Sequence, residues 1–210
     1  MAKHKLPEDY ELRTFATSVE LRSEDDKPPR GFGHFAVFNQ RTEIWPGFFE
    51  EVAPGAFDDV LKDDVRVLMN HNPDLILART GSKTARIGVD DVGGTVEWDF
   101  PNTTTGNDLR ESMQRGDIAE MSFGFTVREN KWTDLEDGKV LRTILKIKRL
   151  YDVSPVTFAA YPQTDVALRS HEAWKESHEE PPPPPPPDNT AEIERKAKER
   201  ARKLSLLKNK

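Results

Sequence analysis

The sequence predicts an α+β domain that is mainly β, followed by a proline-rich linker and a charged tail. Three observations support this fold class. Most apolar segments are short and alternate with a period of two residues, which is typical of half-buried strands. Only two short segments before Ser170 have helical spacing. After Ser170 the apolar pattern ends, so we expect a domain at 1–170, a polar and polyproline linker at 171–190 and a basic tail at 191–210.

Short apolar segments in the N-terminal half predict strands. Aromatic and β-branched residues, which favour pleated strands, are frequent in 10–22 and 31–39. The segment 65–69 alternates apolar and polar residues and runs directly into the sequence N-H-N. Two further segments flank the sequence D-D-V-G-G and are expected to pair as a hairpin, at 84–89 and 95–100.

Two helices are expected. The first, at 54–62, has a proline suited to the first helical turn and apolar residues at helical spacing, which are Phe57, Val60 and Leu61. The second, at 107–115, begins with an asparagine and is ended by Gly116.

A long hairpin is predicted from two alternating segments in the C-terminal half. In 118–128 and 140–153 the odd-numbered positions are mostly apolar, so Ser122 and Asp152 share the face that points away from the core, toward solvent. A three-residue loop at 136–138, with its glycine in the left-handed region, puts both odd-numbered faces on the core; a two-residue loop does not. In that register Ser122 lies directly opposite Asp152, and a β-bulge would shift the pair by a residue or two.

Composition limits the class of protein. The chain has 210 residues and no cysteine, which removes disulfides, thiolate metal sites and cysteine nucleophiles. Of its 31 basic and 37 acidic side chains, eight and four lie in 188–210, which leaves 23 and 33 in 1–187. This acidic body argues against nucleic acid as the main ligand. We find neither a membrane-spanning apolar run nor a signal-peptide core, and expect a soluble cytoplasmic protein with no membrane partner and no secretion signal.

The C-terminal region has a composition of its own. Residues 181–187 are all proline, which predicts a stiff polyproline spacer. Beyond it, apolar residues recur at spacings of three and four among charged ones, at Ile193, Ala197, Ala201, Leu204 and Leu207. Such a short amphipathic helix is marginal alone in water, so it is expected either to dock on a partner or to remain a solvated tail.

Three residues have the chemistry that a serine hydrolase needs: His71, Ser122 and Asp152. A serine hydroxyl is a poor nucleophile until an imidazole takes its proton, and a carboxylate orients that imidazole. Each of the three also has an ordinary interpretation. His71 could be a structural histidine at a strand end, Ser122 a plain strand residue, and Asp152 the partner of a nearby lysine, Lys146 or Lys148. His34 is a rival base, but its neighbours are core-like.

Other catalytic signatures are missing from the sequence. No G-x-S-x-G motif surrounds Ser122, which argues against an α/β-hydrolase. We find no phosphate-binding G-x-x-x-x-G-K-[ST] loop, no H-E-x-x-H motif and no EF-hand pattern. No second histidine accompanies His71 and Asp74 as metal ligands, so no metal or cofactor is predicted.

Four segments resemble the prohead, or head-maturation, serine proteases of tailed phages. They are V-A-P-G-A-F-D-D-V-L (52–61), V-L-M-N-H-N-P-D-L-I-L-A-R-T (67–80), M-S-F-G-F-T-V (121–127) and D-V-S-P-V-T-F-A-A-Y-P (152–162). All four occur in the family's order, and the resemblance extends over about residues 12–168.

The resemblance implies a fold, a site and a biological role. The family is similar to the herpesvirus assemblin-type proteases, so we expect a mostly antiparallel β-barrel with a few surrounding helices. It implies His71 as general base, Ser122 as nucleophile and Asp152 as third member. It also implies cleavage, inside the immature capsid in the host cytoplasm, of scaffold or of the scaffold-like extension of the major capsid protein, and of the protease itself.

The chain departs from the family pattern at three places. Many relatives have glutamate where Asp152 stands, glycine at Ala78, and Pro-Ala at 159–160, where this chain has two alanines. A shorter carboxylate must lie closer to the imidazole, so the first departure bears on the third catalytic role.

The leading hypothesis is therefore a serine endopeptidase of virion assembly, with the loop 79–83 as a candidate source of backbone N–H groups for the oxyanion. The alternative is a non-catalytic β-barrel assembly module, which would bind partners through its proline run and tail; an oligomer is compatible with either. A metal hydrolase is a more distant third hypothesis.

Overall fold

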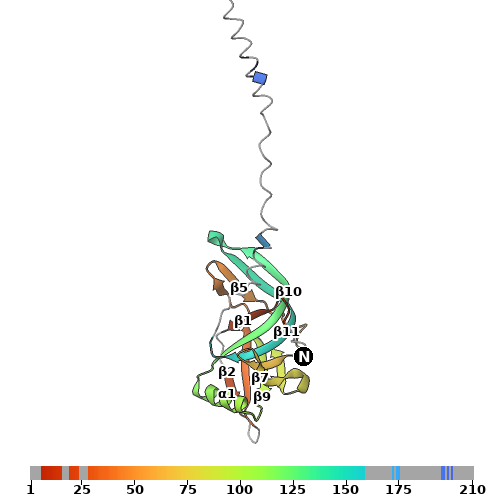
Figure 1. The fold of residues 1–210 in the computed structure, drawn as a ribbon, viewed down its shortest axis with the longest axis vertical. Helices are drawn as coiled ribbons and strands as arrows, with labels where there is room; N and C mark the ends of the chain where they lie inside the picture. The colour runs from red at the N-terminus through yellow and green to blue at the C-terminus, as the bar shows by residue number, and fades with distance from the viewer. Residues whose placement is uncertain are drawn as a thin grey trace, which may run out of the picture. The chain divides into compact units, whose positions relative to one another are not determined.

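Two β-sheets contain almost all of the regular structure in the computed structural model, which describes residues 6–15, 19–23, 28–158, 172, 174, 175, 195, 196, 198 and 200 (Figure 1). The larger sheet has seven strands, in the order β1 (Glu11–Phe15), β10 (Glu120–Asp134), β11 (Val140–Val156), β5 (Phe48–Val52) and β4 (Thr42–Trp45). β6 (Arg66–Met69) also pairs with β11, and β7 (Asn72–Arg79) with β6. The smaller sheet has the order β2 (Val19–Arg22), β3 (Arg30–Val37), β9 (Gly93–Asp99) and β8 (Ala85–Val89).

The main core lies between these sheets. It combines buried aromatic residues of the larger sheet with those of the smaller one, among them Phe15, Phe35, Trp98, Phe123 and Phe125. The mainly β fold class is therefore confirmed. The closed barrel is not found, because both sheets are open within the described part of the chain, with β1 and β4 at the two ends of the larger one. No helix among the described residues is long and apolar enough to cross a bilayer.

Most predicted strands are present, and three others were missed. The segment 10–22 forms two strands, β1 and β2, that belong to different sheets, while 31–39, 65–69 and the 84–100 hairpin match β3, β6 and β8–β9. β4 and β5 were missed because T-E-I-W is short and F-F-E-E-V does not alternate. β7 was missed because its first residues are exposed and polar, with a proline among them.

The helix expected at 54–62 is wrong. The segment forms successive turns, in which Ala56, Val60 and Asp63 each donate a backbone hydrogen bond to the residue three positions earlier. Gly55 has a positive φ of 82°, which a right-handed helix does not allow, and this breaks the first turn. The helical spacing still identified buried side chains correctly, because Phe57 and Val60 are in the core.

The second predicted helix is present as α1 (Thr104–Arg115), which begins three residues before the predicted start. Its N-cap is Thr103, whose side chain accepts a hydrogen bond from the backbone N–H of Gly106. Gly116 ends the helix with a φ of 78°, as predicted. Leu109 and Met113 attach the helix to the core.

The β10–β11 hairpin has the predicted loop but not the predicted register at its far end. The loop 136–138 has three residues, with Gly138 at a φ of 70°, and near it the pairs follow the expected register, as in Asp134 opposite Val140. Four register shifts follow between the pairs at Asn130 and Gly124 of β10, most of them with the extra residue on β11, and they move the pairing by two residues. Asp152 therefore lies opposite Gly124, and Ser122 lies opposite a second serine.

The same bulges change which residues of β11 are buried. The predicted alternation put odd-numbered residues on the core, and Leu141, Ile147 and Val153 are indeed buried. Within 144–153, however, the buried apolar residues are Ile144, Ile147, Leu150 and Val153, at a spacing of three. Leu145 and Tyr151 are only half-buried. A bulge inserts an extra residue and bends the strand, so strict alternation cannot continue through it. The hairpin is accordingly strongly curved (Figure 1).

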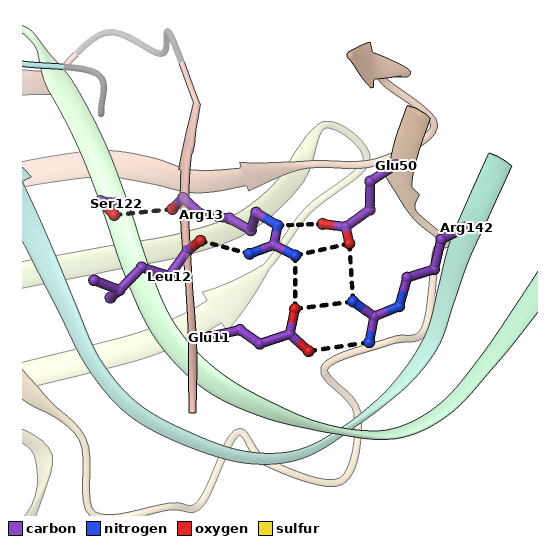
Figure 2. Close-up of polar contacts among 6 residues, drawn as sticks. All are labelled: Glu11, Leu12, Arg13, Glu50, Ser122 and Arg142. Atoms are coloured by element: carbon purple, nitrogen blue, oxygen red, sulfur yellow. Dashed lines mark hydrogen bonds and ion pairs between the residues drawn. The ribbon is translucent and has the colours of Figure 1, made fainter. Parts of the chain in front are cut away.

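Four buried charged side chains connect strands that are not neighbours in the sheet (Figure 2). Arg13 of β1 donates to Glu50 of β5 at 2.5 and 2.9 Å and to Glu11 at 2.6 Å. Arg142 of β11 donates to Glu11 at 2.8 and 3.0 Å and to Glu50 at 3.1 Å. We call Glu11, Arg13, Glu50 and Arg142 the charge cluster. Side chains thus join β1 to β5 and β11, two strands with which β1 has no backbone pairing.

The chain divides into two units, Met1–Trp174 and Lys175–Lys210. In the first unit, Trp174 stacks on Trp132 of β10, with ring centroids 5.5 Å apart. Most of the predicted linker and tail lies outside the described residues; those described between Arg195 and Arg200 are helical.

Candidate functional site

The first site residue, His71, lies in a tight turn between β6 and β7. Asn70 and His71 have positive φ values of 52° and 56°, and their flanking residues, Met69 and Asn72, are paired. Two positive φ values at the centre of a two-residue hairpin define the turn type that suits the twist of paired strands. Asparagine and histidine are among the residues that tolerate this backbone conformation best.

Side chain and backbone contacts hold this turn against the end of β11. The backbone N–H of Asn70 donates to the carbonyl of Pro155 at 3.1 Å. The Asn70 amide and Thr157 exchange two hydrogen bonds, of 2.9 and 3.1 Å. The backbone N–H of His71 donates to Ser154 Oγ at 3.3 Å. These bonds place the imidazole over the strand that carries Asp152.

The structure brings His71, Ser122 and Asp152 into one hydrogen-bonded row. His71 Nδ1 lies 2.5 Å from Asp152 Oδ1, and His71 Nε2 lies 2.6 Å from Ser122 Oγ. Because of the shifted register, Ser122 lies opposite Ser154 and reaches the imidazole diagonally across the hairpin from Asp152. The predicted direct Ser122–Asp152 pairing is therefore wrong, although both residues do share one face.

That face is covered, so its expected exposure to solvent is also wrong. Ser122 is 1% exposed and Asp152 is 4% exposed, whereas the His71 side chain is 16% exposed. Tyr10, just before β1, lies over the strand and donates its hydroxyl proton to Asp152 Oδ2 at 2.7 Å. Access to the row is therefore from the imidazole side.

Two hydroxyl groups at the site were not found from the sequence. One is that of Tyr10; the other belongs to Ser154, which donates to Asp152 Oδ1 at 3.1 Å and is fully buried. Ser154 could have been suspected, because it lies two residues after Asp152 on the same strand face. No sequence pattern connected Tyr10 with the site, because Tyr10 lies outside β1 and far from the other site residues in sequence.

The Ser122 hydroxyl has two acceptors within reach. Besides His71 Nε2, the backbone carbonyl of Arg13 lies 2.9 Å from Ser122 Oγ (Figure 2). A hydroxyl has one proton, so it donates to one of these two at a time. The charge cluster holds the guanidinium of Arg13, and although burial opposes ionisation, Arg13 and Arg142 keep the pKa of Glu11 below its usual value. The carbonyl beside Ser122 thus belongs to a firmly held strand.

The rival base His34, and Lys146 as a possible partner of Asp152, both bond elsewhere in the structure. His34 Nε2 lies 2.8 Å from Asp90 Oδ2 in the smaller sheet. Lys146 bonds to the carbonyl of Gly55 and to Asp58, not to Asp152.

The loop 79–83 does not suit the oxyanion role that we considered for it. Its N–H groups at Arg79, Thr80 and Lys83 already donate within the fold, to Thr84 Oγ1, to the Val65 carbonyl and to the Thr80 carbonyl. Within the described ranges, no three histidine or acidic side chains are grouped as metal ligands.

Tyr10 should make the stability of the fold depend on pH in the alkaline range. Burial, followed by the negative charge of Asp152, raises the pKa of Tyr10 well above its ordinary value of about 10. A pKa raised by folding means that the stabilisation is fully present below the unfolded value and is lost as pH rises through the folded one. We expect the urea midpoint to fall between about pH 9 and pH 11. Tyr10→Phe should reduce that fall, and an equal fall in both proteins would contradict the assignment.

The geometry of the three side chains defines a class of catalytic site. A serine oxygen, an imidazole and a buried carboxylate in this order, with these distances, form the arrangement of a Ser-His-Asp triad, which recurs on unrelated folds.

The comparisons with known proteins then identify the family. The family model described as caudovirus prohead serine protease matches residues 17–177. The chain belongs to this family. It is 28% identical over 140 residues to the prohead protease of Enterobacteria phage HK97, a match that covers 64% of this chain and 57% of that protein. The chain thus spans little more than half the length of this curated relative.

Among solved structures, the chain is similar to the capsid assembly protease of bacteriophage T4. The match has a TM-score of 0.42 and 12% sequence identity, and it covers 70% of this chain and 97% of that one.

Proposed function

We propose that this protein is a serine endopeptidase of phage prohead maturation, with Ser122 as nucleophile, His71 as general base and Asp152 as orienting carboxylate. The observation that carries the proposal is the continuous hydrogen-bonded row from Ser122 through the imidazole to a carboxylate that is 4% exposed. Membership of the prohead serine protease family supports the same assignment.

The proposed reaction begins with proton transfer. Asp152 accepts a hydrogen bond from Nδ1–H of the neutral imidazole, which leaves Nε2 unprotonated and able to take the Ser122 proton. Ser122 Oγ then attacks a peptide carbonyl, and the resulting imidazolium is stabilised by the adjacent carboxylate. His71 returns the proton to the leaving amine, which leaves an acyl-enzyme, and a water molecule activated by the same imidazole hydrolyses the ester.

The protons on His71 decide whether the Ser122 hydroxyl donates to the imidazole or to the Arg13 carbonyl. When His71 is neutral, the Ser122 proton can go to Nε2, which is the reactive arrangement. When both imidazole nitrogens carry protons, Nε2–H donates to Ser122 Oγ, and the hydroxyl proton turns to the Arg13 carbonyl at 2.9 Å. In the second arrangement the serine cannot be deprotonated by His71, so only the first arrangement is reactive.

The proposed substrates follow from the family. We infer that the enzyme cleaves scaffold or the scaffold-like extension of the major capsid protein, and also itself, inside the immature capsid in the host cytoplasm. The relative from phage HK97 is named a prohead protease, which supports an action within the prohead. Co-expression with the cognate capsid protein, followed by mass spectrometry of the fragments, tests this part, and intact capsid protein in assembled particles would contradict it.

Covalent labelling tests the catalytic assignment without a known substrate. A fluorophosphonate probe should label wild-type protein at Ser122, whereas Ser122→Ala and His71→Ala should remain unlabelled and folded. Ser82→Ala is the matched control, because Ser82 is an exposed serine that bonds to the Arg79 carbonyl, and it should be labelled normally. Labelling that persists in Ser122→Ala, or its absence from wild-type protein both free and in particles, would refute the assignment and favour a non-catalytic assembly module.

A further inference from the structure

The Asp152 carboxylate has more hydrogen-bond donors than the triad requires. Its Oδ1 faces His71 Nδ1 and also accepts from Ser154 at 3.1 Å. Its Oδ2 accepts the phenol proton of Tyr10 at 2.7 Å. A carboxylate bonded on both oxygens cannot rotate without breaking a bond, so the donor on Oδ2 also controls where Oδ1 points.

Gly124 creates the space in which Tyr10 meets Asp152. A β-carbon at Gly124 would lie 2.0 Å from the Tyr10 hydroxyl oxygen and 2.4 Å from Asp152 Oδ2. These distances are too short for any side chain, so the phenol occupies the place that a residue of β10 would otherwise fill. Gly124 is also the direct cross-strand partner of Asp152.

The ring of Tyr10 is held independently of the carboxylate. It packs edge-on against Tyr151, with ring centroids 5.7 Å apart, and its backbone N–H donates to the carbonyl of Pro7 at 3.2 Å. Removal of the hydroxyl alone should therefore leave the ring in place. Burial raises the pKa of the Tyr10 phenol, so it remains a donor well above neutral pH.

We propose that Tyr10 is a positioning residue of the reaction: its hydroxyl fixes Asp152 Oδ2, so that Oδ1 faces the Nδ1 proton of His71 and water is excluded from the carboxylate. The inference rests on the proposed serine protease function. It adds a fourth side chain to the row, supplied by the segment that precedes β1. Tyr10 acts through Asp152, to which its hydroxyl donates.

Tyr10→Phe and Tyr151→Phe form a matched pair, because each removes one hydroxyl from one of two contacting rings. We expect Tyr10→Phe to slow fluorophosphonate labelling about tenfold, which corresponds to the loss of one hydrogen bond to a charged group. Tyr151→Phe should label at the wild-type rate. Equal rates for Tyr10→Phe and wild type, or equal slowing by both variants, would overturn the proposal.

A double variant separates positioning from a general loss of packing. If Tyr10 acts only through the carboxylate, Tyr10→Phe should not slow labelling further in an Asp152→Asn background. A further tenfold loss in that background would show a structural effect and would reject the proposal.

Proton NMR gives a readout that needs no activity. The proton shared by His71 Nδ1 and Asp152 should exchange with water faster in Tyr10→Phe than in wild type, and not in Tyr151→Phe. Unchanged exchange in Tyr10→Phe would refute the inference even if labelling confirms Ser122. If wild-type protein is never labelled, the proposed function fails, and the exchange measurement alone decides whether Tyr10 holds Asp152.

Discussion

Asp152→Asn is expected to lower the rate of fluorophosphonate labelling, and of peptide cleavage, by about four orders of magnitude while the fold remains intact. The amide oxygen should take the side of the Tyr10 donor, which turns the amide NH2 toward His71 Nδ1. The imidazole must then accept at Nδ1 and carry its proton on Nε2. In that tautomer it cannot accept the proton of Ser122, so the nucleophile is not activated.

Asp90→Asn is the matched control for this experiment. Asp90 also contacts a histidine, His34, at 2.8 Å, but in the smaller sheet. The control should therefore retain wild-type labelling. Circular dichroism and thermal unfolding of both variants would verify that they are folded. A loss of less than about tenfold in Asp152→Asn would show that the carboxylate does not set the tautomer.

Arg142→Met should produce the largest loss of stability. Arg142 is 1% exposed and donates three hydrogen bonds to Glu11 and Glu50, so its removal leaves two buried carboxylates with one guanidinium. Removal of one partner from a buried ion pair typically costs about 3–5 kcal/mol, because the remaining charge is uncompensated. Urea unfolding followed by fluorescence would measure the change.

Arg128→Met provides the control for that measurement. Arg128 pairs with Asp59 at 2.9 Å, but about half of each side chain is exposed, and such pairs contribute little to stability. Its unfolding midpoint should stay close to that of wild type, and a similar midpoint for Arg142→Met would contradict the prediction. The loss of stability in Arg142→Met would measure the cost of an uncompensated buried charge, not the net contribution of the charge cluster. An apolar replacement of all four members of the cluster can be neutral.

The alternation of apolar and polar residues predicted where the strands lie, but not where β-bulges interrupt them. The alternation in 118–128 and 140–153 identified β10 and β11, and the glycine at 138 identified their loop. The bulges between Gly124 and Asn130 have no sequence signature as clear as alternation, because they arise from the bending of two long strands around a shared core. The register at Ser122, 14 residues from the loop, therefore came out wrong by two.

Burial was easier to predict than conformation at 54–62. Phe57 and Val60 are buried because they are large and apolar, and successive turns serve this purpose as well as a helix does. Gly55 was the one local sign against a helix. The charge cluster is a different case, since alternation assigned charged residues to the exterior and nothing in the order of the chain pairs Glu11 with Arg142. Only the curved sheet brings them together.

His71 was recognised as a candidate for its chemistry, whereas its position depends on contacts distant in sequence. Its turn is attached to Ser154, Pro155 and Thr157, which lie more than 80 residues further along the chain. Tyr10 reaches Asp152 across 142 residues. A single sequence contains no record of such contacts until the fold assembles them.

The attachment of the Asn70–His71 turn to the last residues of β11 has a consequence for how the proposed triad could be taken apart. Base and acid both belong to or are anchored on one stretch of six residues, from Asp152 to Thr157, so they should stay together when neighbouring elements loosen. Ser122 belongs to the other arm of the hairpin. Partial separation of β10 from β11 would thus withdraw the nucleophile from an otherwise intact His–Asp couple, and closing the ladder again would restore the whole row in one step.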